Sequence, residues 1–131
     1  MPPKKKGRKS AAVLAAEKRI RDAAIECARI ADARRATDVT VLHVEATIFV
    51  TDYFVIASAR NKRQIQAIAT DVYDFLRKEG FKWTRMEGYE EGSWVLIDSG
   101  SIVVHVFRED LRAYYDLEML WGDAPKIDWK K

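Results

Sequence analysis

The stretch that decides the fold is Ser93–Phe107, which reads SWVLIDSGSIVVHVF. Two runs of apolar, mostly β-branched residues flank the letters DSGS, and this is the pattern of a β-hairpin. A two-residue turn at Ser99–Gly100 would supply the positive φ that tight hairpins require. In that register Trp94 lies directly opposite His105. The other face of the hairpin then carries only apolar residues: Val95, Ile97, Ile102, Val104 and Val106.

Three segments with strong periodic patterns precede the hairpin. Ser10 can cap a helix whose apolar residues recur at helical spacing up to about Ala36. The segment 37–44 is rich in β-branched residues and indicates a strand. Tyr53–Ala57, YFVIA, is a continuous apolar run, which is typical of a strand buried on both faces. The residues between these two strands give no clear pattern.

A second helix has the clearest start and end signals. Asn61 can cap it, Gln64 can complete a capping box, and Gly80 stands where a left-handed C-terminal residue belongs. We expect the strand at 53–57, this helix and the strand at 94–97 to form a βαβ unit with parallel strands. The hairpin then adds an antiparallel strand. The sequence therefore predicts an α+β fold with a mixed β-sheet flanked by helices.

The segment Arg108–Trp121 predicts a last helix, which Gly122 and Pro125 would end. One face should pack on the sheet, and it consists of Ala113, Tyr114, Leu117, Leu120 and Trp121. The opposite face consists of Arg108, Leu111, Arg112, Tyr115 and Met119. Because Tyr, Met and Arg are enriched at protein–protein interfaces, this second face is predicted to bind a partner.

Length and charge divide the 131-residue chain into one domain, 11–125, with short tails on either side. The segment 1–10 has five basic residues and no acid, and it is predicted to be a disordered basic tail that can touch RNA phosphates weakly. The segment 126–131 is expected to be a C-terminal tail. The segment from Met86 to Pro125 contains nine acidic residues and two arginines, which gives it a net charge of −7. Outside the basic tail the chain has 18 basic and 20 acidic residues, and a neutral-to-acidic body of this kind argues against a surface for wrapping nucleic acid.

Other features favour a soluble, cytoplasmic protein. Cys27 is the only cysteine, so the chain has no disulfide framework or zinc pattern, and its place on an apolar helix face indicates a core residue. No apolar run approaches the roughly 18 residues of a membrane span. The N-terminus lacks the apolar stretch of a secretory signal. We therefore expect neither a membrane nor a cofactor.

One pattern suggests an enzyme and fails on geometry. Gly100–Ser101 followed by Asp116 and Glu118 is loosely similar to the elements with which nucleotidyltransferases hold Mg²⁺ and phosphates. On a strand two carboxylates one residue apart point the same way, but in a helix that spacing diverges by about 200°. The Gly-Ser also falls in a hairpin turn and opens no helix. A metal-dependent nucleotidyltransferase and an RNA-binding module that uses the basic tail are kept as alternatives.

Several motifs together resemble the iojap-like ribosomal silencing factors. They span roughly residues 13–125 and read TDYFVIAS (51–58), RQIQAIA (63–69), EG (87–88), WVLIDSGSIVVHVF (94–107) and RxxYDLExLWGDAP (112–125). The departures are modest, with Ala59, Asn61 and Ser101 standing where the family more usually has Gly, Ser and Asp. The helix cap stays intact.

The resemblance implies a fold similar to nucleotidyltransferases but without their catalytic carboxylates, in a protein that is not an enzyme. It further implies binding to the large ribosomal subunit, through a ribosomal protein of the intersubunit face, which blocks joining of the small subunit and represses translation under nutrient limitation. The free protein is expected to be a homodimer. The acidic, aromatic-rich hairpin and last helix suit a basic ribosomal protein. The residues predicted to bind it are Trp94, Asp98, His105, Arg112, Tyr115, Asp116, Glu118 and Trp121.

Overall fold

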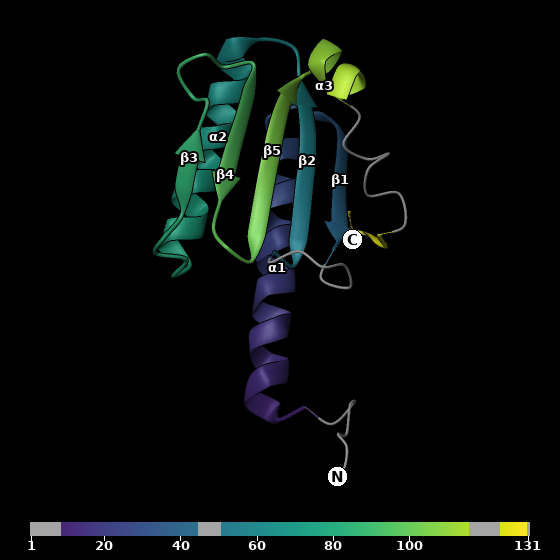
Figure 1. The fold of residues 1–131 in the computed structure, drawn as a ribbon, viewed down its shortest axis with the longest axis vertical. Coiled ribbons are helices and arrows are strands. Elements are labelled where there is room, and N and C mark those ends of the chain that lie inside the picture. The colour runs from purple at the N-terminus through teal and green to yellow at the C-terminus, as the bar shows by residue number, and fades with distance from the viewer. Residues whose placement is uncertain (1–8, 45–50, 116–123, 131) are drawn as a thin grey trace.

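The computed structural model describes residues 9–44, 51–115 and 124–130, with 113–115 described by their backbone alone. Two long helices and a short one accompany a six-stranded sheet of order β3-β4-β5-β2-β1-β6 (Figure 1). The predicted α+β class with a mixed sheet is confirmed. The elements are α1 (Ala11–Ala33), β1 (Thr37–His43), β2 (Tyr53–Ala59), α2 (Lys62–Lys78), β3 (Arg85–Glu87), β4 (Trp94–Asp98), β5 (Ile102–Arg108), α3 (Glu109–Tyr115) and β6 (Lys126–Ile127).

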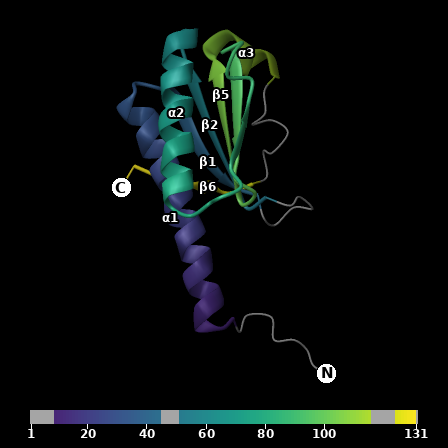
Figure 2. The same ribbon diagram turned by 90° about the vertical axis from the view of Figure 1, so that its left-hand side faces the viewer.

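Helices α1 and α2 both cover the same face of the sheet (Figure 2). Ser10 caps α1 by accepting a hydrogen bond from the backbone N–H of Val13, as the sequence predicts. Cys27 lies on the buried side of α1 and is fully buried, which confirms it as a core residue. The first turns of α1 project beyond the sheet, and Leu14 there remains 53% exposed. No helix in the described segments combines the length and apolar character needed to cross a membrane.

The caps of α2 follow the sequence closely, with one difference. Asn61 Oδ1 accepts from the backbone N–H of Gln64 at 2.9 Å. The Gln64 side chain, however, reaches back to the N–H of Arg60 and not to that of Asn61. Gly80 has φ +98° just beyond the helix, which is the left-handed conformation expected of it. Helical spacing predicts an apolar stripe on α2, and all of its members except the partly buried Phe75 are fully buried: Ile65, Ile68, Ala69, Val72 and Leu76.

The predicted βαβ unit is wrong in its second strand. Strand β2 pairs in parallel with β5, and β4 runs antiparallel to β5, so β4 is antiparallel to β2. Strand β3, which is only three residues long and is not predicted from the sequence, follows α2 and pairs with β4. The crossover from β2 through α2 therefore enters the edge strand β3, and the chain then turns back into β4. The parallel pair at the centre of the sheet forms between strands far apart in sequence.

The hairpin forms with its turn one residue later than predicted. Asp98 pairs with Val103, and the N–H of Ser99 donates to Ile102 O, so Gly100–Ser101 are the central turn residues. Gly100, at φ +91°, takes the first central position, which suits a type II′ turn. The pairing shifts by two residues in register, so each side chain keeps its predicted face. Trp94 now lies opposite Phe107 and diagonal to His105.

The segment predicted as a C-terminal tail belongs to the fold as far as the structure describes it. Strand β6 pairs antiparallel with β1 at the edge of the sheet. Trp129 is only 8% exposed, and its Nε1–H donates to Val39 O at 3.0 Å. The indole buries enough apolar surface to hold this short strand in place. The predicted basic tail 1–10 lies outside the described residues except for Lys9 and Ser10.

The side chain of Arg112, on α3, points toward the sheet and not outward as predicted. The side chain was expected on an outward face, but it is 7% exposed and donates to Ser58 Oγ, Thr40 Oγ1 and Asp38 O. Strand β1 carries an extra residue between Thr37 and Thr40, and Asp38 there has a positive φ of 48°. Such a bulge leaves backbone groups without strand partners, and the guanidinium of Arg112 satisfies one of them. The expected continuation of this helix from 116 to 121 lies outside the described residues.

Candidate partner-binding surface

The face of the sheet opposite α1 and α2, called here the open face, carries an unusual set of apolar side chains. Strand alternation sends every second residue of β2, β4 and β5 to this side. In the described segments only α3 lies over it, near one end (Figures 1 and 2). Its central residues are Phe54, Ile56, Trp94, Leu96, Val103, His105 and Phe107.

Four rings form an aromatic cluster on this face: Phe54, Trp94, His105 and Phe107. Trp94 stacks on Phe107 with ring centroids 4.7 Å apart, and Phe54 meets His105 edge-on at 5.2 Å. Phe107 is fully buried, whereas Trp94 and Phe54 remain half-buried. The cluster is therefore a rigid floor with two aromatic rings at its surface. Aromatic surface held in this way is typical of energetic anchors in protein interfaces.

His105 is a neutral group in this cluster near pH 7. Burial lowers the pKa of His105 to about 4, and the nearby Asp98 opposes this only in part. Trp94 Nε1–H donates to His105 Nδ1 at 3.3 Å, so the ring proton resides on Nε2. Nε2 is buried and has no hydrogen-bond partner among the described residues. The imidazole thus orients the Trp94 indole, and no carboxylate of the described segments accepts its Nε2 proton.

One pocket, of about 570 Å³, lies away from the open face. The open face has a separate pocket of about 550 Å³ at the hairpin end. Trp83, which is 85% exposed, forms one wall of this end pocket, and Phe54 and Val103 form its apolar floor. Asp98 and Arg85 lie at its polar side, 3.6 Å apart. Trp83 is not among the site residues predicted from the sequence. A tryptophan between Lys82 and Thr84, outside any helical or strand pattern, was the signal that could have identified it.

The structure brings three of the eight predicted site residues together. Trp94, Asp98 and His105 all lie on the open face, and Trp94 and His105 are neighbours as expected. Arg112 instead holds α3 to the sheet from within the fold. Tyr115 is the last residue of α3, and its side chain is not described. Three further predicted residues fall outside the described segments: Asp116, Glu118 and Trp121.

The described residues offer no constellation that points to catalysis. Among them no group of three His, Cys, Asp or Glu side chains could hold a metal ion. His43 stacks on Tyr53 on the helix-covered face, so the two histidines lie on opposite sides of the sheet. Burial raises the pKa of the Cys27 thiol well above its usual value, which disfavours the nucleophilic thiolate. What the surface provides is an apolar, aromatic area for binding.

Comparison with known proteins gives the family. The family model described as "Ribosomal silencing factor during starvation" matches residues 17–131. The chain belongs to the ribosomal silencing factor family. It is 46% identical over 97 residues to the ribosomal silencing factor RsfS of Bacillus subtilis, which covers 74% of this chain and 82% of that protein. It is also 35% identical to the chloroplastic protein Iojap of Zea mays over 80% of this chain and 46% of that protein.

Solved structures agree with this membership. A crystal structure of a Chromobacterium violaceum protein matches with a TM-score of 0.72 and 33% identity over 80% of this chain and 85% of that chain. A Bacillus halodurans structure matches with a TM-score of 0.67 and 39% identity over 79% of this chain and 94% of that chain. The family match begins at Glu17, so the first turns of α1 lie before the region shared with the ribosomal silencing factors.

Proposed function

We propose that this ribosomal silencing factor binds the large ribosomal subunit through a ribosomal protein of its intersubunit face. The bound protein then blocks joining of the small subunit by occupying its place, and it represses translation when nutrients are limited. Family membership supports the ribosome as target. The observation that carries the mode of binding is the open face, where Trp94, Trp83 and Phe54 present aromatic surface beside Asp98.

The charge around this surface suits a basic partner. Glu87 is exposed on the edge strand β3, beside the open face, and Glu90 and Glu91 are exposed in the turn that follows this strand. Opposite charges on two proteins speed their encounter and fix their relative orientation. The accessible rings of Trp83, Trp94 and Phe54 supply the apolar area that holds the complex once it has formed. A basic ribosomal protein is therefore the partner whose chemistry complements this side of the molecule.

We further propose that the protein acts without chemistry, as a steric block. Gly100 and Ser101, part of the pattern that suggested nucleotidyl transfer, occupy the two central positions of a hairpin turn. Such a turn offers no row of free backbone N–H groups for phosphates. We expect the protein to work in the cytoplasm and to be a homodimer when free. Binding the ribosomal partner is the activity to be measured.

Co-sedimentation with separated ribosomal subunits tests this proposal. The protein should pellet with isolated large subunits and stay in the supernatant with small ones. A matched pair of variants locates the surface, with Trp83→Ala on the open face and Leu14→Ala on the projecting part of α1 as the control. Both residues are exposed, so neither change should unfold the protein. Equal sedimentation of the protein with both subunits would contradict the proposal. An equal loss of large-subunit binding in the Trp83 and Leu14 variants would also contradict it.

A further inference from the structure

Arginines gather where the two long helices meet the sheet turns, on the side away from the open face. Arg34 and Arg35 follow the end of α1, and Arg60 and Arg63 flank the start of α2. Together they line the pocket of about 570 Å³, called here the arginine pocket. Its remaining lining residues are neutral, namely Ala33, Asn61, Gln64 and Ala67. Among the described residues the lining of this hollow thus contains four arginines and no carboxylate.

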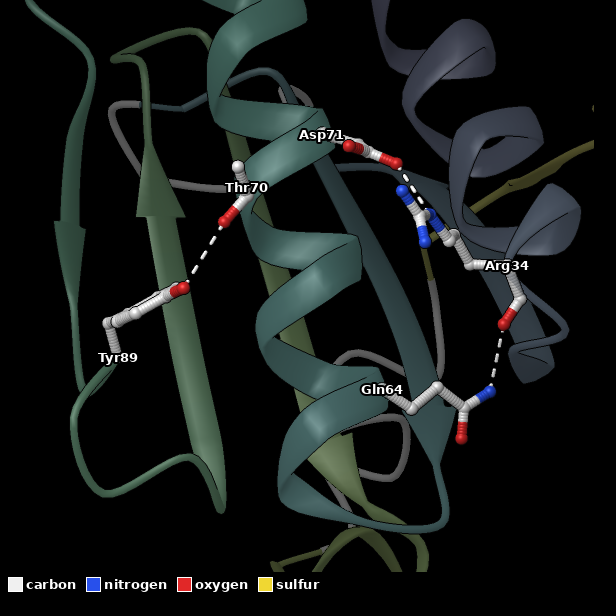
Figure 3. A network of polar contacts seen from close by, with 5 residues as sticks. All are labelled: Arg34, Gln64, Thr70, Asp71 and Tyr89. Atoms are coloured by element: carbon white, nitrogen blue, oxygen red, sulfur yellow. Dashed lines mark hydrogen bonds and ion pairs between the residues drawn. The ribbon is translucent and has the colours of Figure 1, made fainter.

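The walls of the arginine pocket are tied together by hydrogen bonds (Figure 3). Gln64 Nε2 donates to Arg34 O at 2.9 Å, and Gln64 Oε1 accepts from the N–H of Arg60. One side chain therefore joins the end of α1 to the start of α2. Arg34 Nε also donates to Asp71 Oδ2 on α2 at 2.7 Å. These contacts fix the spacing of the two backbone segments that carry the arginines before any ligand arrives, which lowers the entropy cost of binding.

The charge of the pocket is largely uncompensated. Asp71 is held against Arg34, and it does not line the pocket. Arg35, Arg60 and Arg63 are exposed and form no ion pair within the described segments. Like charges placed this close repel one another unless an anion joins them. Guanidinium groups bind phosphate oxygens through paired hydrogen bonds, so phosphate is the anion that fits best.

We propose that the arginine pocket binds phosphates of the ribosomal RNA backbone when the protein lies on the large subunit. The choice of RNA as the phosphate source rests on the proposed function. The exposed arginines come from two separate turns and border an open hollow, which suits a backbone passing across them. Because the pocket and the open face lie on opposite sides of the sheet, both can be occupied at once. The RNA contact would then orient a protein that the open face anchors.

A salt titration of RNA binding tests the proposal on the full chain. Binding to an unstructured RNA oligonucleotide is followed by fluorescence anisotropy between 50 and 200 mM salt for three proteins. The pocket variant is Arg60→Gln with Arg63→Gln. The control variant is Arg21→Gln with Lys82→Gln, which removes two equally exposed charges elsewhere. The basic N-terminal segment is present in all three and contributes equally.

In the pocket variant the negative slope of log affinity against log salt concentration should be less steep by about 1.4, because each single-strand phosphate contact contributes about 0.7 to its steepness. Over this salt range the parent then loses about sevenfold more affinity than the pocket variant. The control variant should keep the parent slope. The pocket variant should also pellet less completely with large subunits at the higher salt.

Three outcomes would overturn the inference. Equal slopes for the pocket and control variants would show only a diffuse charge effect. An unchanged slope in the pocket variant would show that RNA does not use the pocket. Saturable binding of inorganic pyrophosphate that is lost in the pocket variant, with RNA binding intact, would assign the pocket to a small polyphosphate. If no form of the chain pellets with large subunits while the RNA slopes behave as expected, the proposed function fails and the phosphate site stands.

Discussion

Replacing Arg112 by Met should destabilise the fold strongly without changing the hairpin end of the open face, which α3 does not cover. The change removes the guanidinium and keeps an apolar stem of similar length. The hydroxyl of Ser58, which is 1% exposed, then loses its hydrogen-bond donor. A buried polar group without a hydrogen-bond partner lowers the free energy of unfolding by about 1–3 kcal/mol. The bonds to Thr40 Oγ1 and Asp38 O lie partly in reach of water and contribute about 0.5–1.5 kcal/mol each. We expect a total loss of about 4 kcal/mol in the free energy of unfolding.

Urea unfolding followed by tryptophan fluorescence measures this loss. Arg108→Met is the matched control, because Arg108 lies four residues earlier and its ion pair with Asp110 is exposed to water. Exposed pairs contribute little to stability, so the control should unfold near the parent midpoint. The folded fraction of the Arg112 variant should bind large subunits normally. Equal midpoints for the two variants would refute the structural role, and a stable Arg112 variant that fails to bind would return this residue to the partner-binding surface.

Two further predictions concern the open face. Trp83→Ala should change the free energy of unfolding by no more than about 0.5 kcal/mol, because the side chain is 85% exposed, and should weaken large-subunit binding about thirtyfold. Normal binding in a titration would remove Trp83 from the interface. The His105 pKa, about 4 when folded against 6.5 when unfolded, means that the unfolded chain takes up the proton first. Stability should therefore fall by about 2 kcal/mol from pH 7.5 to pH 5, and His105→Phe should flatten this fall in urea titrations at both pH values.

The sequence predicts those elements whose signals are local. Ser10, Asn61 and Gly80 mark helix ends through bonds to neighbours within a few residues, and all three are confirmed. The hairpin faces follow from strand alternation, which a shift of the turn by one residue leaves unchanged. Trp94 and His105 therefore stay neighbours on one face, although Trp94 pairs with Phe107 and not with His105 as predicted. Local pattern also gives the buried stripe of α2.

Long-range contacts decide what the sequence does not predict. The parallel pairing of β2 with β5 depends on β3, which is too short to leave a periodic pattern. The helical wheel places Arg112 with the outward residues, but a bulge in β1 creates carbonyl and hydroxyl acceptors that draw the side chain inward. The sequence around Trp129 predicts a tail, because only the pairing of β6 with β1 makes this segment part of the sheet. In each case the partner lies at least 49 residues away.

Inhibition of subunit joining tests the central claim most directly. Large subunits are incubated with the protein, small subunits are added, and light scattering follows the formation of complete ribosomes. We expect joining to fall with increasing protein, in proportion to the large subunits occupied, and Trp83→Ala to need a correspondingly higher concentration. Joining at the normal rate and extent, with the protein demonstrably saturating the large subunits, would contradict the steric account.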